Sequence, residues 1–188
     1  MDFALHTTDT APDAAKPLVQ KSLDTYGFVP NLHAVMAEAP PLLEAYQLVG
    51  GLYAKTNLSV LERQVVLQAI NFENGCHYCV AAHSMIATLE KMPADVLDAL
   101  RAGTPIADAK LEALRSFAAK VARQRGWLDE ADFDALLAAG YTRQTALEVI
   151  LANAYKVMSN YVNHVAETPL DAAFQQHAWT KPAQQAAE

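Results

Sequence analysis

Apolar residues recur at intervals of three and four along most of this chain, and runs that alternate apolar with polar residues are nearly absent. A spacing of three and four places side chains on one face of an α-helix, whereas a strand requires alternation. Alanine, the strongest helix former, is abundant throughout the chain. The pattern predicts an all-α fold of about seven to nine helices.

Several residues are expected to begin or end these helices. A first helix should run from about Ala14 to Tyr26 and end at Gly27. Ser59 and Glu62 have the spacing of a capping box, which predicts a helix start at Ser59. A break at Asn74-Gly75 should precede another helix that begins near Cys76. Further helix starts are predicted at or near Pro40, Pro93, Leu111, Asp129 and Thr142, and a turn at Val29-Pro30-Asn31.

Length and composition favour one compact domain. The chain has 188 residues, of which 52% are apolar and 19% are charged, a balance typical of a globular protein. We expect a single domain over residues 1–175, because no linker divides this part. Residues 176–188 hold one Gln pair and four alanines, which predicts a loose C-terminal tail.

Charge and hydropathy narrow the expected partners and location. The formal net charge is −7, and the basic residues are scattered, so nucleic acid is not an expected partner. No uncharged apolar stretch approaches the roughly 18–20 residues of a membrane-spanning helix, so a membrane is not expected either. The N-terminal residues lack the basic and apolar regions of an export signal. We therefore expect a cytoplasmic protein.

The only two cysteines lie three residues apart, as Cys76 and Cys79, and His83 follows four residues later. On a helix these three side chains share one face. A close dithiol beside an imidazole favours redox chemistry, because the thiolate is the reactive species and a base promotes its formation. Cys79, one turn from His83, is the better nucleophile, and Cys76, nearer the helix end, is suited to resolve the product.

Three other interpretations of the cysteines remain open. They could be ordinary core residues, since cysteine is among the most buried residue types. They could hold zinc together with His77 and His83, although structural zinc sites usually draw their ligands from two separate segments. A thioredoxin-like fold would need a βαβ pattern around the motif, and none is visible.

The segment Glu73 to Ser84, Glu-Asn-Gly-Cys-His-Tyr-Cys-Val-Ala-Ala-His-Ser, resembles the motif of AhpD-like alkylhydroperoxidases in the carboxymuconolactone decarboxylase family. The preceding Leu58-Ser59-x-x-Glu62-Arg63-Gln64 extends the likeness. Three further segments resemble the peroxidase-related members of that family: Gly27-Phe-Val-Pro-Asn31, Pro40-Pro41-Leu42-Leu43 and Thr168-Pro-Leu-Asp171. Together these segments cover most of residues 20–175.

The resemblance implies an AhpD-like helical fold that assembles into homo-oligomers, with trimers or hexamers favoured. It implies that Cys79 is the peroxidatic cysteine, that Cys76 resolves, and that His83 is the active-site histidine. The substrate would be a hydroperoxide, and no cofactor would be bound. An external dithiol would reduce the disulfide, a dihydrolipoyl group on a partner protein in the best-known branch.

Two positions depart from the best-known branch. Its proton-relay carboxylate is replaced here by Gln64, whose amide cannot hold a proton at neutral pH. A histidine immediately before the second cysteine is replaced by Tyr78. Glu73 and Glu62 are the nearby carboxylates that could substitute for the missing acid, and Glu73 is the closer to Cys76 in sequence.

The sequence thus predicts a thiol-dependent peroxidase or disulfide oxidoreductase. Cys79, Cys76, His83, Glu73 and Gln64 are its candidate catalytic residues. The alternative is a non-redox member of the same fold, either a small-ligand-binding protein or an enzyme of the decarboxylase and lactone type.

Overall fold

The computed structural model describes residues 2–182, and this range contains nine α-helices, one 3₁₀-helix and no strand. The prediction of an all-α fold is confirmed. The elements are α1 (Lys16–Tyr26), α2 (Asn31–Met36), α3 (Pro40–Tyr53), α4 (Val60–Glu73), α5 (His77–Leu89), α6 (Ala94–Ala102), α7 (Ala109–Arg123), α8 (Glu130–Ala138), α9 (Arg143–Ala166) and the 3₁₀-helix η1 (Ala172–His177).

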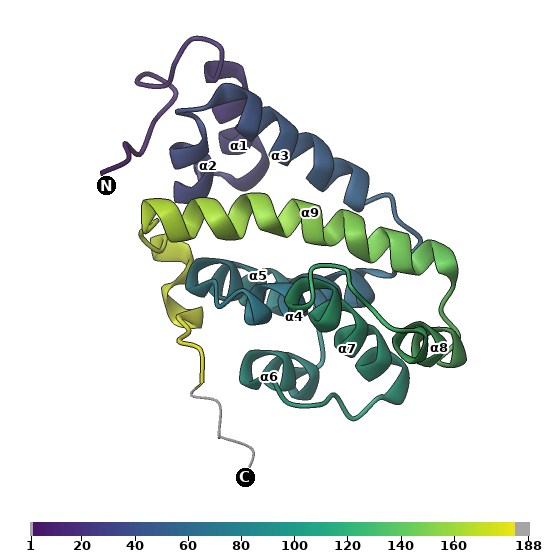
Figure 1. The fold of residues 1–188 in the computed structure, drawn as a ribbon. Coiled ribbons are helices and arrows are strands. Elements are labelled where there is room, and N and C mark those ends of the chain that lie inside the picture. The colour runs from purple at the N-terminus through teal and green to yellow at the C-terminus, as the bar shows by residue number, and fades with distance from the viewer. Residues whose placement is uncertain (1, 183–188) are drawn as a thin grey trace.

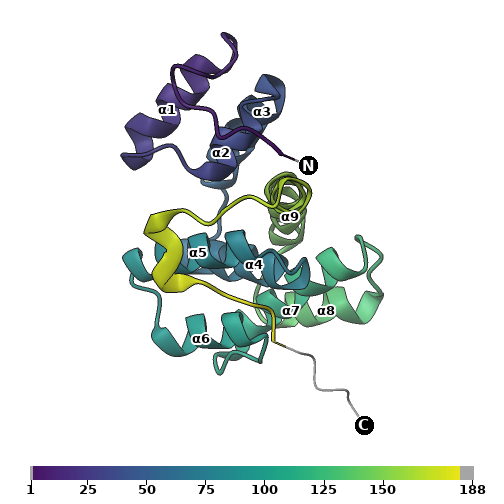
Figure 2. The same ribbon diagram turned by 90° about the vertical axis from the view of Figure 1, so that its left-hand side faces the viewer.

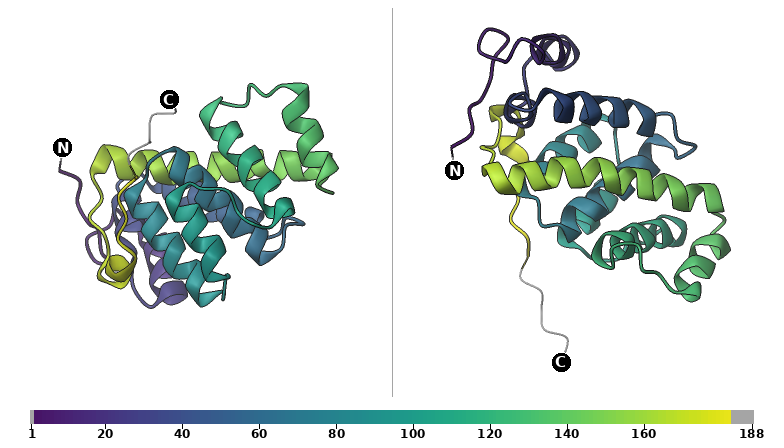
Figure 3. Two further views of the ribbon diagram at one scale, coloured as in Figure 1. Left: turned by 90° about the horizontal axis from the view of Figure 1, so that it is seen from below. Right: turned by 45° about the horizontal axis from the view of Figure 1, so that its top comes forward.

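Helix α9 lies between two groups of helices (Figures 1 and 2). Helices α1, α2 and α3 lie on one side of it, and α4 to α8 lie on the other. Figure 3 shows α9 crossing the full width of the molecule, and both α3 and α4 pack directly against it. Because α9 contacts both groups, its inward-facing side chains help to form the core on each side.

Three apolar clusters fill these layers, and two of them bear on the site. The first joins α4, α7 and α9 through fully buried residues such as Val66, Leu114 and Val149. The second joins α1–α3 to α5 and η1, and it contains both Cys76 and Cys79. Burial of each large aliphatic side chain contributes about 1.5–3 kcal/mol, so the cysteines lie in a rigid and apolar part of the protein.

Helix ends follow the capping chemistry expected from the sequence. Ser59, Asp129 and Thr142 each cap a helix, with reciprocal hydrogen bonds to the residue three positions later. Gly27 ends α1 in the left-handed conformation. Each cap of this kind contributes about 0.5–2 kcal/mol, and the predicted helix boundaries at these four positions are confirmed.

The turn between α4 and α5 determines where the cysteines lie. Gly75 has φ +64°, a left-handed conformation that favours glycine. The Cys76 N–H donates to the Asn71 carbonyl and the Gly75 N–H to the Phe72 carbonyl, the hydrogen bonds of a Schellman motif. The chain therefore leaves α4 and enters α5 at once, with Cys76 as the N-cap residue.

Two segments differ from the expectation. Residues 31–36 form the short helix α2, where a turn was predicted at 29–31, and its N-terminal Asn31 follows Pro30 directly. Beyond residue 175, where the sequence predicted a loose tail, the Trp179 indole donates to the Arg101 carbonyl and the Lys181 ammonium to the Glu73 carbonyl. This part of the predicted tail is held against the domain, and residues 183–188 lie outside the described residues.

None of the helices within residues 2–182 is both long enough and apolar enough to span a bilayer.

Candidate active site

Both thiols lie at the N-terminal end of α5. Cys76 is the N-cap residue and Cys79 lies in the first turn. Backbone N–H groups in a first helical turn have no partner within the helix, and their partial positive charge favours an anion such as a thiolate. Local folding alone therefore places the Cys79 sulfur where ionisation is favoured.

The two cysteine side chains approach to 3.3 Å, and neither forms a disulfide. Cys76 is 0% exposed and Cys79 is 2% exposed. The Asn163 amide donates to both sulfurs, at 3.2 Å from Cys79 Sγ and 3.7 Å from Cys76 Sγ. An S–S bond is about 2.05 Å long, so a disulfide requires only a small closing movement of the two side chains.

A stripe of polar residues on α9 faces these thiols. The spacing of its members at i, i+3, i+4 and i+7 places them on one helix face. All of them are buried, with between 0% and 6% of each residue exposed. The stripe consists of Lys156, Ser159, Asn160 and Asn163. The sequence analysis did not identify these residues as part of the site.

Asparagines attach this stripe to the turn that carries the thiols. The Asn160 amide donates to Asn71 Oδ1 at 3.0 Å, and the Asn74 amide donates to Asn160 Oδ1 at 2.8 Å. Asn71 in turn donates to the Cys79 carbonyl. Because the Asn71 and Asn160 amides each use both donor and acceptor, α9 and the start of α5 are held in fixed relative positions.

Lys156 is a buried cation. It is 1% exposed, and its Nζ lies 3.0 Å from His83 Nε2 and 5.4 Å from the centroid of the Tyr155 ring. Within residues 2–182, no carboxylate oxygen lies within 4.0 Å of its Nζ. A buried ammonium is costly unless an anion compensates it. The Cys79 thiolate is the group at this site that can supply that negative charge.

The two thiols have opposite pKa shifts. Burial raises the pKa of Cys79, but the hydrogen bond from Cys76, the Lys156 charge and hydrogen bonds from the α9 stripe outweigh it, so the net pKa is lowered. The pKa of Cys76 is raised, first because its thiol donates to Cys79 and second because it is buried. The environment thus favours a Cys79 thiolate beside a neutral Cys76 thiol.

His83 and Gln64 lie together, as the sequence predicted. Gln64 Oε1 can only accept, so His83 Nδ1, 3.0 Å away, is the donor and Nε2 is left to accept from Lys156. Burial first, and the Lys156 charge second, hold the pKa of His83 well below its usual value. The imidazole is therefore neutral and its lone pair is already occupied. Whether His83 acts as the base for Cys79 or positions Lys156 stays a prediction.

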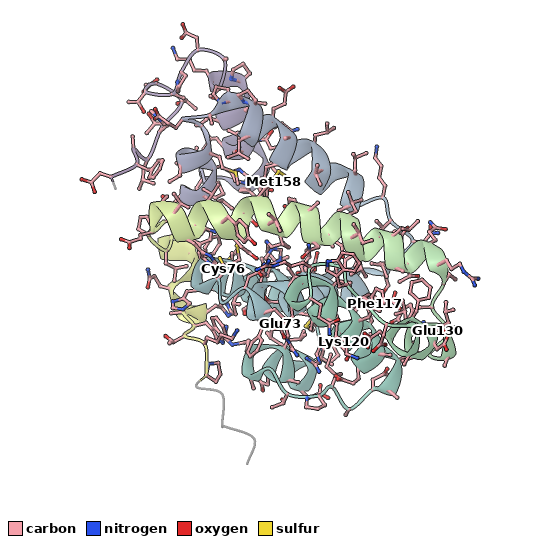
Figure 4. All side chains as sticks on the ribbon, viewed as in Figure 1. Glu73, Cys76, Phe117, Lys120, Glu130 and Met158 are labelled. Carbon is pink, nitrogen blue, oxygen red and sulfur yellow. The ribbon has the colours of Figure 1, made fainter. Side chains whose placement is uncertain are left out.

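The structure does not bring either nearby glutamate to the thiols. Both carboxylate oxygens of Glu73 accept from Arg123, at 2.7 and 3.0 Å. Figure 4 shows Cys76 under α9 and Glu73 closer to α7. Glu62 caps α4, accepts from the Tyr141 hydroxyl and pairs with Lys110. Each carboxylate is engaged by groups outside the site, and a relay role for Glu73 stays a prediction.

Tyr78 connects the site to the C-terminal segment. Its hydroxyl donates to Asp171 and accepts from the Leu32 N–H, and Asp171 also accepts from the Asn31 N–H. The Tyr78 ring packs edge-on against Phe174. Tyr78 therefore ties α5 to α2 and η1 and is engaged in structural contacts.

A cavity of about 330 Å³ reaches the nucleophile. Cys79, His83 and Lys156 are among its polar lining residues, and Cys76 does not line it. The rest of the wall is mainly aromatic and aliphatic and includes Tyr26, Phe28, Tyr46, Met85, Leu89 and Phe174. The cavity is large enough for an organic molecule, and of the two sulfurs only Cys79 lines it.

Comparison with solved structures shows which fold this is. The alkylhydroperoxidase AhpD core protein of Ralstonia eutropha JMP134, described as an uncharacterized peroxidase-related protein, superposes with a TM-score of 0.80. It is 26% identical and the match covers 92% of this chain and 93% of that one. The chain has the AhpD-like fold. No protein-family model matches it, and no curated protein matches it in sequence.

Two further structures share the AhpD-like fold. A peroxidase-related protein from Silicibacter sp. TM1040 has a TM-score of 0.77 and 22% identity, over 90% of this chain and 91% of that one. The debrominase Bmp8, solved as a cysteine-to-alanine variant in complex with 2,3,4-tribromopyrrole, also has a TM-score of 0.77, with 21% identity over 94% and 95% of the two chains. The resemblance inferred from the cysteine segment is confirmed.

In this AhpD-like chain, Gln64 occupies the position that the sequence analysis matched to the relay acid of the best-known branch. The Gln64 amide orients His83, and His83 accepts from Lys156. This chain of hydrogen bonds ends at the Lys156 side chain on α9. No group of three or more His, Cys, Asp or Glu side chains in the described residues is placed to hold a metal ion.

Proposed function

We propose that the protein is a thiol-dependent peroxidase of the alkylhydroperoxidase type, with Cys79 peroxidatic and Cys76 resolving. One observation carries the proposal. Cys79 lines an organic-sized cavity, lies 3.3 Å from a second thiol, and has its thiolate stabilised by a buried ammonium that has no carboxylate partner within the described residues. These are a nucleophile, a resolving thiol and a proton donor in one place.

The reaction balances with these groups. The Cys79 thiolate attacks the terminal oxygen of a hydroperoxide, the O–O bond breaks, and Cys79 becomes a sulfenic acid. The departing alkoxide takes a proton from the Lys156 ammonium and leaves as an alcohol. The Cys76 thiol then attacks the Cys79 sulfur, which forms the disulfide and releases water. The two thiols supply the two electrons that reduce the peroxide.

An external dithiol completes the cycle. Of the two sulfurs, only Cys79 lines the cavity, so an incoming thiolate attacks Cys79 and releases Cys76. The second thiol of the donor then displaces Cys79, which restores the thiolate and returns a proton to Lys156. A dihydrolipoyl group on a partner protein has the required chemistry, and a reducing cytoplasm is the compartment that would keep both cysteines in use.

The test is peroxide consumption by the reduced protein, with dihydrolipoamide and thioredoxin offered separately as donors. Turnover with at least one donor is expected, and Cys79→Ser should abolish it. The variant Ser84→Ala, which keeps both thiols, Lys156 and His83, is the matched control. Consumption that is unchanged in Cys79→Ser would show that the thiols do not carry the activity.

Reductive dehalogenation of a small aromatic ring is a second candidate. The cavity is walled by aromatic rings from Tyr26, Phe28, Tyr46 and Phe174, and Bmp8, which shares the fold, is a debrominase whose variant binds 2,3,4-tribromopyrrole. The same dithiol would supply two electrons and become a disulfide, a thiol proton would replace bromine on the ring carbon, and bromide would leave. Bromide release from 2,3,4-tribromopyrrole by the reduced protein, without peroxide consumption, would favour this function over the first.

A further inference from the structure

A second cavity adjoins the one that contains Cys79. It also measures about 330 Å³ and lies against α1 and α3. Five residues line both cavities, so the two are neighbouring parts of one cleft that share a mainly aromatic wall. The shared residues are Thr25, Tyr26, His33, Tyr46 and Tyr155.

The second cavity differs from the first in its chemistry. Ser22 and Gln47 add polar groups to its wall, and Lys21 is the one charged side chain among its ten lining residues. None of those ten residues is acidic, and Lys21 is exposed. An ammonium in a cavity without carboxylates attracts an anionic group.

Two consecutive glycines of α3 leave this cavity open. A Cβ built on Gly50 would lie 3.1 Å from the Tyr155 hydroxyl, so glycine allows that ring to lie against the helix. A Cβ built on Gly51 would meet nothing within 4 Å. Gly51 is therefore a position where a larger side chain can narrow the cavity without a steric clash at its Cβ.

We propose that the second cavity is a subsite for the remote carboxylate of an elongated apolar substrate, with Lys21 as its ion-pair partner. The inference rests on the proposed function, because it places the hydroperoxide end of the substrate at Cys79. The apolar chain occupies the wall formed by Phe28, Met85 and Leu89, and passes the shared aromatic residues towards Lys21. A substrate as small as hydrogen peroxide would leave both the apolar wall and Lys21 unused.

Binding tests the subsite without depending on peroxidase activity. Oleate and methyl oleate are titrated separately into the protein, and the Kd of each is measured by calorimetry. We expect oleate to bind more tightly than its ester, and Lys21→Ala to weaken oleate binding about fivefold while leaving the ester unchanged. Lys55→Ala, which removes an exposed lysine that lines neither cavity, is the matched control and should change neither Kd.

Turnover tests the same subsite in the reaction. With linoleic acid hydroperoxide, Lys21→Ala should raise KM about fivefold at constant kcat, and Gly51→Leu should raise KM for both the acid and its methyl ester. Neither variant should alter turnover of tert-butyl hydroperoxide, which is too short to reach Lys21.

The possible outcomes separate the two proposals. If oleate and its ester bind equally well to the unaltered protein and to Lys21→Ala, the subsite is wrong, whatever the peroxidase result. If oleate binding depends on Lys21 but no hydroperoxide is consumed, the subsite stands and the proposed peroxidase function fails.

Discussion

The Nζ of Lys156 lies 3.0 Å from Nε2 of His83, on the wall of the same cavity that Cys79 lines. The His83 imidazole is neutral, and its other nitrogen donates to Gln64. The lysine ammonium is therefore positioned by a neutral acceptor and its charge is available to the Cys79 thiolate.

Replacement of Lys156 tests the origin of the Cys79 reactivity. The lowered pKa of Cys79 means that its thiolate persists as pH falls below the usual value of about 8.5. Lys156→Met keeps the side-chain length and removes the charge, so the pKa should rise to 8.5 or above and turnover at pH 7 should fall about 100-fold. Iodoacetamide alkylation across pH measures the shift. Lys55→Met is the control, and an unchanged alkylation profile in Lys156→Met would contradict the assignment.

Variants of His83 show whether this residue positions Lys156 or acts as the base for Cys79. If His83 positions Lys156, His83→Ala should raise the Cys79 pKa by less than Lys156→Met does. His83→Gln should restore part of the effect, because an amide oxygen can accept from the ammonium. If His83 is instead the base, both variants should lose the low pKa completely. Alkylation profiles of the two variants, compared with that of Lys156→Met, distinguish these results.

Glu73→Gln tests the carboxylate that the sequence favoured as a relay. Glu73 pairs with Arg123 in the structure, so turnover should stay within about twofold of the unaltered protein. Loss of a pair whose arginine is 62% exposed should lower the free energy of unfolding by about 0.2–1 kcal/mol, which urea denaturation measures. A fall in turnover of tenfold or more would restore Glu73 as a proton acceptor.

We also expect this chain to assemble into homo-oligomers. Large apolar side chains such as Leu147 and Ile150 on α9 are 68% and 53% exposed, and exposed apolar surface favours association. Light scattering should give a mass that is a multiple of the 20.4 kDa chain, with trimers or hexamers favoured. A monodisperse monomer at micromolar concentration would contradict this prediction.

Much of the fold could be predicted from local sequence signals. The caps at Ser59, Asp129 and Thr142, and the glycine that ends α1, act within a few residues, so their effect can be inferred directly. The short helix α2 was missed because its six residues follow Pro30, and such a segment is indistinguishable from a turn until Leu32 and Met36 pack into a core.

The cysteines and His83 were predicted from their closeness in sequence, and Gln64 from the family resemblance. The cysteines and His83 share a helix, so their proximity follows from helix geometry. Lys156 lies on another helix, and its role depends on packing that no local signal encodes. A usable signal did exist, since the polar residues of α9 at i, i+3, i+4 and i+7 share one helix face. Glu73 is close to Cys76 in sequence, but its carboxylate accepts from Arg123 of α7.

The central claim is that Cys79 and Cys76 together reduce a peroxide, and thiol counting tests it most directly. Reduced protein is treated with one equivalent of cumene hydroperoxide, and free thiols are counted before and after dithiothreitol. We predict the loss of two thiols per alcohol formed and full recovery with dithiothreitol. In Cys76→Ser, dimedone should trap a sulfenic acid on Cys79, located by mass spectrometry. Two thiols that survive the peroxide unchanged would contradict the account and favour a non-redox ligand-binding or decarboxylase-type role.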